Sequence, residues 1–455
     1  MLLSASMVLG SFAVVAGPAP QAAAQIAPET WTVFVYLCGD NNLEGYAMED
    51  LLEMESVGSK NGVTIIVLLD TLTIAEGTHW LVIEEGVSHY DAETGVLDCD
   101  CDLFPEDACP GEVDMGDGSK LTWAVVTAFT YAPADHYMLV LWDHGGGWRG
   151  VCYDDSSLAE GTDGWVSRLT TPETAASLQA AQDQLRTGVD KEYKLTILGY
   201  DACLNAMVEV AYQNRNIADY MFASINLVPG PGMGYAGFLK VMTEDSPTVE
   251  EVGIAVVDSY IEFYENMVSP TGQGLEYCGD VTLSFLKLGA SVNDLVDDIH
   301  ALTVEIFEGG YLEDFSYRGA IESAESQTPR IPTYMGEQMP FIDLGLFAEA
   351  LGQKIPALSE LTDAVVEGVD EVVVYENHCT SAGGAVLRTS GISIYFTCSY
   401  HWINPAYWFE DIDDAELYGE NTLYYGMDFT VNTWWDEFVF TFTQAYDESV
   451  LDFEN

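Results

Sequence analysis

Short apolar runs alternate with helical patterns along the first half of this chain. The runs are rich in β-branched and aromatic residues, as in WTVFVYL at 31–37 and VTIIVLLD at 63–70, and such runs are typical of strands buried on both faces. Helical patterns follow at 43–57, 119–131 and 171–185, with Ser119 and Thr171 as expected N-caps of the last two. The alternation predicts an α/β fold whose mostly parallel central sheet has helices on both faces.

The second half of the sequence is less regular. Helices are expected there at 249–267, at 291–307 and within 356–376, and a hairpin at 383–397, whereas the first half contains a third expected strand at 78–85. We find no internal repeat and no linker, and the length suffices for a large core. Residues 25–455 are therefore expected to form a single domain with an elaborated C-terminal half.

Two of the expected strands end in residues with catalytic chemistry. LVLWDHGGGW places His144 directly after one apolar run, and LTILGYDACLNA places Cys203 after another, at the expected start of a helix. In open α/β sheets, ligands bind at the carboxyl ends of the strands. A helix N-terminus and a nearby imidazole both activate a thiol. Taken singly, Cys203 reads equally as a buried core thiol and His144 as a turn histidine; their equivalent placement favours a catalytic pair.

Residues beside this pair suggest supporting roles. The glycine run that starts at Gly145 lets the backbone approach a substrate, so its N–H is a candidate oxyanion donor. Asp201 shares a face with Cys203 in an extended segment and suits recognition of Arg or Lys, although a turn or N-cap role is the alternative. The polar residues after the first strand, Asp40, Asn41 and Asn42, can supply a group that orients His144, and Asn41 is the chosen candidate; helix capping is the alternative.

The charge balance is strongly acidic. The chain has 74 Asp and Glu against 14 Lys and Arg, a formal net charge of -60. Such a field repels phosphate backbones and argues against nucleic-acid binding. It favours basic substrates, and it equally fits a solvated surface or a protein kept soluble in high salt.

The first 24 residues resemble an export signal. An apolar run from Met1 to Ala16 precedes a Gly-Pro break and the small residues Ala22 to Ala24. No Lys or Arg precedes the run, so an uncleaved short anchor is the alternative, and membrane attachment is expected only in that case. We expect a secreted, monomeric protein with residues 1–24 as its signal peptide.

The nine cysteines give an odd number, so at least one thiol is left over in the monomer. Cys99, Cys101 and Cys109 lie in the loop DCDCDLFPEDACP, where disulfide staples are favoured over zinc because no CxxC pair or nearby His is present. The Asp98-x-Asp100-x-Asp102 run gives a weak indication of calcium, without the Gly and Glu of an EF-hand loop.

Several motifs together resemble the clostripain-like (C11) cysteine peptidases of the caspase–gingipain–legumain clan. They are VYLCGDNNLE, LWDHGGGW, LGYDACLNAMVEVAYQ, FASINLVPGPGMGY, FIDLGLFA and GISIYF, and they extend over nearly the whole chain after the leader. The resemblance implies a caspase-like fold and cleavage of proteins or peptides after Arg or Lys. It also implies a His144/Cys203 dyad, backbone N–H groups of Gly145 and Cys203 as oxyanion donors, and Asp201 at the base of the S1 pocket.

The resemblance carries further expectations. No cofactor is required for the chemistry, but relatives often need Ca²⁺ and often cleave themselves between the two catalytic residues. Arg149 is the preferred self-cleavage site and Arg168 the other candidate, with pairing to surface carboxylates as the alternative role. The sequence departs from the family at 224–226, where Ser-Ile-Asn replaces an acidic Ser-Glu and loosens the expected preference for Arg.

Two rival functions remain on the sequence alone. The chain can be a catalytically inactive binding or surface-assembly protein on the same fold, because fold does not fix function. It can also be a thiol–disulfide protein, although Cys203 lacks a CxxC partner. The presence of His144, Cys203 and Asp201 favours the peptidase.

Overall fold

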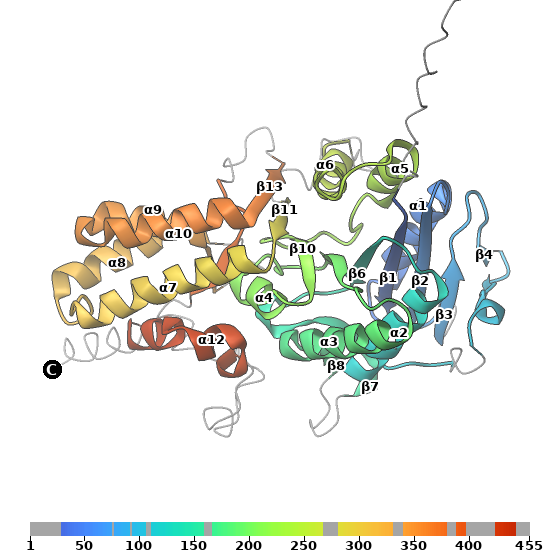
Figure 1. The fold of residues 1–455 in the computed structure, drawn as a ribbon, viewed down its shortest axis with the longest axis horizontal. Coiled ribbons are helices and arrows are strands. Elements are labelled where there is room, and N and C mark those ends of the chain that lie inside the picture. The colour runs from blue at the N-terminus through green and yellow to red at the C-terminus, as the bar shows by residue number, and fades with distance from the viewer. Residues whose placement is uncertain are drawn as a thin grey trace, which may run out of the picture.

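The computed structural model describes residues 29–74, 77–91, 93–105, 111–158, 166–266, 281–330, 340–379, 388–396 and 424–442. The expected signal peptide at 1–24 and Cys109 lie outside the described residues, as do residues 383–387 and 397 of the expected hairpin at 383–397. Figure 1 shows a central sheet with helices on both faces and a group of helices beyond one edge.

The central sheet has eight strands, with order β13-β11-β10-β9-β6-β1-β2-β3. The five strands from β10 to β2 run parallel, and β3, β11 and β13 pair antiparallel at the two edges. This confirms the predicted α/β class with a mostly parallel sheet. The strands are β1 (Trp31–Gly39), β2 (Val63–Thr71), β3 (Gly77–Val82), β6 (His136–Trp142), β9 (Leu195–Asp201), β10 (Ala218–Ala223), β11 (Thr282–Lys287) and β13 (Val373–His378).

Helices cover both faces of this sheet, as Figure 1 shows. One face carries α1 (Glu44–Val57), α5 (Tyr235–Asp245) and α6 (Val249–Asn266), and the other carries α2 (Gly118–Tyr131), α3 (Thr171–Gly188) and α4 (Val208–Gln213). Strand β1 is buried along its whole length, and its successive side chains enter opposite cores. Its uninterrupted apolar run thus follows from burial on two faces.

The second half adds a helical layer beyond the edge formed by β11 and β13, at the left of Figure 1. It confirms the helices expected near 291–307 and within 356–376, and α6 confirms the one at 249–267. The layer contains α7 (Ala290–Glu308), α8 (Phe315–Gln327), α9 (Leu344–Lys354) and α10 (Ser359–Val372), with α12 (Asp428–Asn432) beside α4.

Short elements complete the described fold. The strand β14 (Ser393–Tyr395), which lies within the expected hairpin, pairs antiparallel with the distant β12 (Phe341–Asp343). The others are β4 (Tyr90–Asp91), β5 (Val96–Leu97), β7 (Val151–Leu158) and β8 (Val166–Leu169), and the 3₁₀ turns η1 (Cys101–Leu103), η3 (Gly147–Arg149), η4 (Pro356–Leu358) and η6 (Tyr424–Gly426).

Both predicted N-caps are displaced by one or two residues. The side chain of Asp117, rather than Ser119, caps α2 by accepting a hydrogen bond from the N–H of Ser119. Thr170, rather than Thr171, caps α3 by accepting from the N–H of Glu173. In each case the capping residue has extended backbone angles, which an N-cap requires and the first helical residue does not have.

Among the described residues we find no helix with both the length and the apolar character needed to cross a membrane.

Candidate active site

His144 and Cys203 follow adjacent strands at the same edge of the sheet. β6 and β9 are parallel neighbours, and their last residues, Trp142 and Asp201, are paired in register. The backbone N–H of Asp143 donates to the carbonyl of Asp201 at 3.2 Å, which extends the pairing one residue past β6. The topology thus brings the two predicted catalytic residues to one sheet edge.

Gly145 lies directly against the backbone of Cys203. A Cβ atom at this glycine would stand 2.3 Å from the carbonyl oxygen and 2.6 Å from the nitrogen of Cys203. Any other residue is therefore excluded by backbone atoms that cannot move independently. The N–H groups of Gly145 and Val228 both donate toward the Cys203 sulfur, the latter at 3.3 Å. Backbone donors thus converge on the sulfur, where acyl-transfer chemistry needs them.

Cys203 does not start a helix, contrary to the sequence expectation. The helix α4 begins at Val208, and Leu204 takes a left-handed φ of 71°. The turn after β9 is held instead by the loop after β10, since the N–H of Leu204 donates to the carbonyl of Asn226 at 2.9 Å. Burial raises the pKa of the Cys203 thiol, and the hydrogen bonds from Val228 and Gly145 partly offset that effect. The environment of Cys203 thus favours the thiol over the thiolate.

The residue that contacts His144 is Asn42, which corrects the prediction for Asn41. Nε2 of His144 lies 2.9 Å from Oδ1 of Asn42. Burial lowers the pKa of the half-buried His144, with the charge of Asp155 opposing, so the imidazole is neutral near pH 7.

Asn41 binds Asp143, the residue before His144, rather than the imidazole itself. It points into the protein, where its Nδ2 donates to Oδ1 of Asp143 at 2.7 Å and to the carbonyl of Tyr153 at 3.0 Å. Asp143 is buried and also accepts from the N–H of Tyr153. Asp143 directly precedes His144, and these bonds tie it to Asn41 after β1 and to Tyr153 in β7. Sequence reasoning chose Asn41 from the three polar residues after β1, and it missed Asp143, which is adjacent to His144.

Asp201, the residue predicted to lie at the base of an S1 pocket, is buried. Its side chain is 3% exposed, and its Oδ2 accepts from the N–H of Met233 and the hydroxyl of Tyr235, both at 3.1 Å. Within the described part of the chain, Oδ1 has no hydrogen-bond partner. Burial is the main cause that raises the pKa of Asp201 to about 7.

A second carboxylate, missed by sequence reasoning, stands beside Asp201. Asp50 on α1 accepts a hydrogen bond from Nε1 of Trp142 at 2.6 Å. A Cβ at Gly232 would lie 2.7 Å from Oδ2 of Asp50 and 3.0 Å from Oδ2 of Asp201, so this glycine packs against both. Burial, followed by the charge of Asp201, raises the pKa of Asp50 well above its ordinary value. A helical pattern alone does not reveal which acidic residues of α1 turn inward.

The segment at 224–226 supports the turn that carries Cys203. Ser224 and Asn226 are buried, and their carbonyls accept from the N–H groups of Ala206 and Leu204, both at 2.9 Å. The side chain of Asn226 is engaged locally, because its Oδ1 accepts from the N–H of Leu227. The neutral segment thus holds the turn that carries Cys203.

Arg149 lies in a folded turn, which argues against its expected role as a self-cleavage site. It ends η3, where its N–H donates to the carbonyl of Gly146 and the N–H of Gly150 to that of Gly147. The next residue, Val151, is 1% exposed and pairs with β8. A scissile bond must lie extended in the active site, and this one is constrained on both sides. Arg168 lies within β8.

The predicted calcium run at Asp98–Asp102 does not gather its carboxylates. Oδ2 of Asp100 instead accepts from the N–H of Val82 and lies 3.1 Å from Nε2 of His89. The expected disulfide is not formed at Cys99, which lies beside Cys101 as a thiol. The group of described residues that can hold a metal lies elsewhere and consists of Asp40, Asp70, Glu112 and Asp154.

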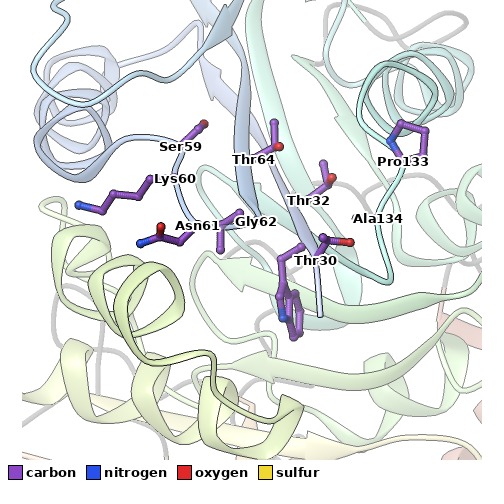
Figure 2. A pocket seen from close by; sticks show the side chains of 11 residues that line it. Thr30, Thr32, Ser59, Lys60, Asn61, Gly62, Thr64, Pro133 and Ala134 are labelled. Carbon is purple, nitrogen blue, oxygen red and sulfur yellow. The ribbon is translucent and has the colours of Figure 1, made fainter. Parts of the chain in front are cut away.

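A cavity of about 340 Å³ lies at the opposite end of the sheet (Figure 2). Its lining includes Thr30, Lys60, Asn61 and Pro133, which stand near the amino ends of β1, β2 and β6. His144 and Cys203 stand at the carboxyl ends, so we do not assign this cavity to catalysis.

A Cys and a His at adjacent strand ends of a mostly parallel α/β sheet, with backbone donors at the sulfur, form the kind of arrangement that cysteine peptidases use. The model of the Clostripain family matches residues 35–446. The chain therefore belongs to the Clostripain family of C11 peptidases.

Individual relatives agree with this assignment. The chain is 30% identical over 229 residues to clostripain of Hathewaya histolytica, which covers 45% of this chain and 40% of clostripain. A secreted C11 cysteine protease from Bacteroides thetaiotaomicron, solved with an irreversible peptide inhibitor, shares the fold with a TM-score of 0.58 at 21% identity. That match covers 90% of this chain and 99% of the other. An inactive zymogen C11 protease from Parabacteroides distasonis gives a TM-score of 0.54 at 17% identity, with the same coverage.

Proposed function

We propose that this chain is a secreted cysteine endopeptidase that cleaves protein or peptide substrates after Arg or Lys, with Cys203 as nucleophile and His144 as general base. The observation that carries the proposal is the contact between Gly145 and Cys203. It places an oxyanion-type N–H beside a thiol, one residue from an imidazole.

The protonation states of the dyad set the order of events. Burial favours the thiol form of Cys203 and the neutral form of His144. Proton transfer from sulfur to imidazole thus accompanies the attack on the scissile carbonyl. Because Nε2 faces the amide oxygen of Asn42, Nε2 carries the ring proton and Nδ1 accepts the thiol proton.

The reaction then follows acyl transfer. The sulfur–carbon bond forms, and the carbonyl oxygen takes up negative charge that the N–H groups of Gly145 and Cys203 stabilise. Collapse breaks the peptide C–N bond as His144 protonates the leaving amine. His144 next takes a proton from water, which attacks the thioester, and the product acid leaves as the Cys203 thiol is restored. All of these groups belong to the chain, so the chemistry requires no cofactor.

Asp201 supplies the proposed preference for a basic side chain. Its Oδ1 is buried without a partner among the described residues, and Asp50 adds a second carboxylate nearby. A guanidinium or ammonium group entering this space would satisfy the orphaned oxygen and neutralise two like charges. Because the carboxylates come from β9 and α1 rather than from segment 224–226, the proposal holds for both Arg and Lys.

Secretion is proposed from the leader pattern of residues 1–24 and from the secreted relative of Bacteroides thetaiotaomicron. N-terminal sequencing of the protein from culture medium tests it. A mature chain beginning close to residue 25 is expected, and a full-length chain retained with cells would contradict secretion. Gel filtration of the mature chain tests the expected monomer.

Fluorogenic peptides test the activity itself. The purified chain is incubated with otherwise identical peptides that end in Arg, Lys or Asp, before and after alkylation and alongside Cys203→Ala. We expect alkylation-sensitive cleavage of the Arg and Lys peptides and none in Cys203→Ala. Absence of thiol-dependent cleavage of every peptide would favour the inactive binding or surface-assembly protein.

A further inference from the structure

Four carboxylates converge behind the catalytic loop. Asp40 follows β1, Asp70 lies in β2, Asp154 in β7 and Glu112 in the segment before α2. One oxygen from each lies within 4.8 Å of those of the others. Asp40, Asp70 and Asp154 are buried, and Glu112 is at the surface. The cluster therefore opens to solvent on one side only.

Two of the buried oxygens in this cluster have no partner. Oδ1 of Asp40 and Oδ2 of Asp70 accept no hydrogen bond from the described residues, although the two side chains are only 1% and 0% exposed. The remaining oxygens are held in place: Oδ1 of Asp70 accepts from the hydroxyl of Thr78 at 2.9 Å, and Oδ2 of Asp154 from the N–H of Met115 at 2.9 Å. Hydrogen bonds thus hold Asp70 and Asp154 in place, while two buried oxygens of the cluster stay unsatisfied.

Buried like charges require compensation. None of the ion pairs formed by the described residues involves Asp40, Asp70 or Asp154. Carboxylates buried this close together repel one another when they are ionised. A cation would remove this repulsion and satisfy the orphaned oxygens. The ligand set contains only oxygen, which selects a hard cation, and four carboxylates in an irregular cluster suit Ca²⁺ better than Mg²⁺, which retains several waters.

We propose that Asp40, Asp70, Glu112 and Asp154 bind one Ca²⁺ ion, and that this ion fixes the loop that orients His144. The fit to these residues accords with the calcium requirement that the family resemblance implies. The sequence pointed instead to the Asp98–Asp102 run, whose carboxylates do not converge.

The path from the cluster to the imidazole is short. Asp40 directly precedes Asn41 and Asn42, and its carbonyl accepts from the N–H of Asp155 at 2.8 Å. Asp154 directly follows Tyr153, whose N–H donates to Asp143. Both segments that position His144 therefore carry a ligand of the ion. Binding is independent of the proposed peptidase function, whereas the effect on His144 as a catalytic base rests on it.

Binding is best measured in a Cys203→Ala chain stripped of divalent ions with a chelator. Titration calorimetry with CaCl₂ is expected to give one site per chain. Thermal melting is expected to shift upward by about 3 °C at a Ca²⁺ concentration near 100 times Kd. Asp70→Asn in the same background is expected to abolish the site and the shift.

Asp298→Asn is the matched control for loss of one acidic charge. Asp298 lies on α7, and its pKa is raised chiefly by burial and then by Asp294 and Asp297. This acidic group is not among the described clusters whose oxygens converge. The control is expected to bind Ca²⁺ like its parent.

Thermal melting in the absence of calcium distinguishes a variant that does not fold from one that folds but does not bind the ion. Because Asp70→Asn removes a buried like charge, we expect it to melt at or above the temperature of the ion-free parent. If it does not fold, Glu112→Gln at the surface replaces it, with at least a 10-fold increase in Kd expected. A parent without saturable Ca²⁺ binding, or a folded Asp70→Asn with unchanged binding, would overturn the site.

The link to His144 has its own readout. In the Cys203→Ala chain, Ca²⁺ is expected to shift the NMR resonances of the His144 ring, and Asp70→Asn is expected to remove that effect. Unchanged His144 resonances on saturation with Ca²⁺ would overturn the coupling. Because the chain used has no nucleophile, these outcomes do not depend on peptidase activity.

Discussion

Oδ1 of Asn42 lies 2.9 Å from Nε2 of His144. This contact fixes the imidazole from the side opposite its proposed catalytic nitrogen, and it comes from the loop that follows β1 rather than from β6. The next residue back, Asn41, is committed to Asp143 at 2.7 Å. Two adjacent asparagines thus divide two tasks, one at the imidazole and one at the backbone that carries it.

Substitution of each asparagine is expected to separate these tasks. Asn42→Ala should lower kcat on an Arg peptide by on the order of 10-fold, because the imidazole loses its orienting acceptor, and should leave the melting temperature nearly unchanged. Asn41→Ala should destabilise the fold by roughly 1–3 kcal/mol, because buried Asp143 loses a donor. Steady-state kinetics and thermal melts of both variants check this. Equal kinetic losses with equal stability would contradict the assignment.

The close approach of Gly145 to Cys203 predicts a strong dependence on side-chain size. Gly145→Ala should reduce kcat by about 100-fold or more, because a methyl group displaces the backbone that supplies an oxyanion donor. Gly146→Ala is the matched control, since its Cβ would meet the hydroxyl of Tyr153 at 3.0 Å and a flexible arginine at 3.2 Å. A Gly145→Ala enzyme with the kinetics of the control would refute the oxyanion role.

The raised pKa of Asp201 predicts an acid limb in the pH profile. Ionised Asp201 is needed to bind a cation, and burial raises its pKa to about 7, so kcat/KM for Arg peptides should fall as pH drops below about 7. Asp50→Asn should move this limb to lower pH, because it removes a neighbouring negative charge. A limb that Asp50→Asn leaves in place would assign the titration to another group.

The raised pKa of Asp201 also predicts how stability depends on pH, and the direction is opposite to that of kcat/KM. A raised carboxyl pKa stabilises the fold fully only below the unfolded value near 3.8, and this contribution is lost as pH rises toward 7. Asp201→Asn should therefore melt at a higher temperature than the parent at pH 8, with the difference shrinking toward pH 4. It should also lose kcat/KM for Arg peptides by about 100-fold or more, since the cation would enter without its buried partner. A lower melting temperature at pH 8 would contradict the account.

The folded turn around Arg149 predicts that any self-processing occurs elsewhere. Intact masses of the active chain and of Cys203→Ala should reveal no fragment that ends at Arg149. Arg149→Ala should give the same fragment pattern as the parent. A fragment ending at Arg149, formed only by the active chain, would show that the turn opens.

The sequence predicted the sheet well because its strands are buried on both faces. Short, uninterrupted apolar runs such as those of β1 and β2 are compatible with few structures other than a strand buried on both faces. The positions of His144 and Cys203 follow directly from where β6 and β9 end. The local detail after β9 was not predictable in this way. A helix directly after Asp201 is the simplest continuation, yet Leu204 adopts a left-handed turn because the distant loop at 224–226 supplies its hydrogen-bond acceptor.

Long-range pairings account for the other differences. Asn41 and Asn42 are adjacent and chemically identical, so only the direction of the chain after Gly39 decides which one reaches His144. Asp50 meets Asp201 across 151 positions, and β14 pairs with β12 rather than with a neighbouring segment. The carboxylates at Asp40, Asp70 and Asp154 come from three strands or strand ends and leave no local motif. Spacing along the chain carries no information on such convergence.

Site-specific labelling tests the central claim most directly. The mature chain is incubated with a peptide chloromethyl ketone that carries Arg at the reactive position, and an Asp analogue serves as the control. The adduct is then mapped by mass spectrometry. The account predicts one adduct per chain, on Cys203, that forms with the Arg reagent, fails with the Asp reagent and is strongly slowed in His144→Ala. Labelling of another cysteine in place of Cys203, or equal labelling by both reagents in parent and His144→Ala alike, would contradict it.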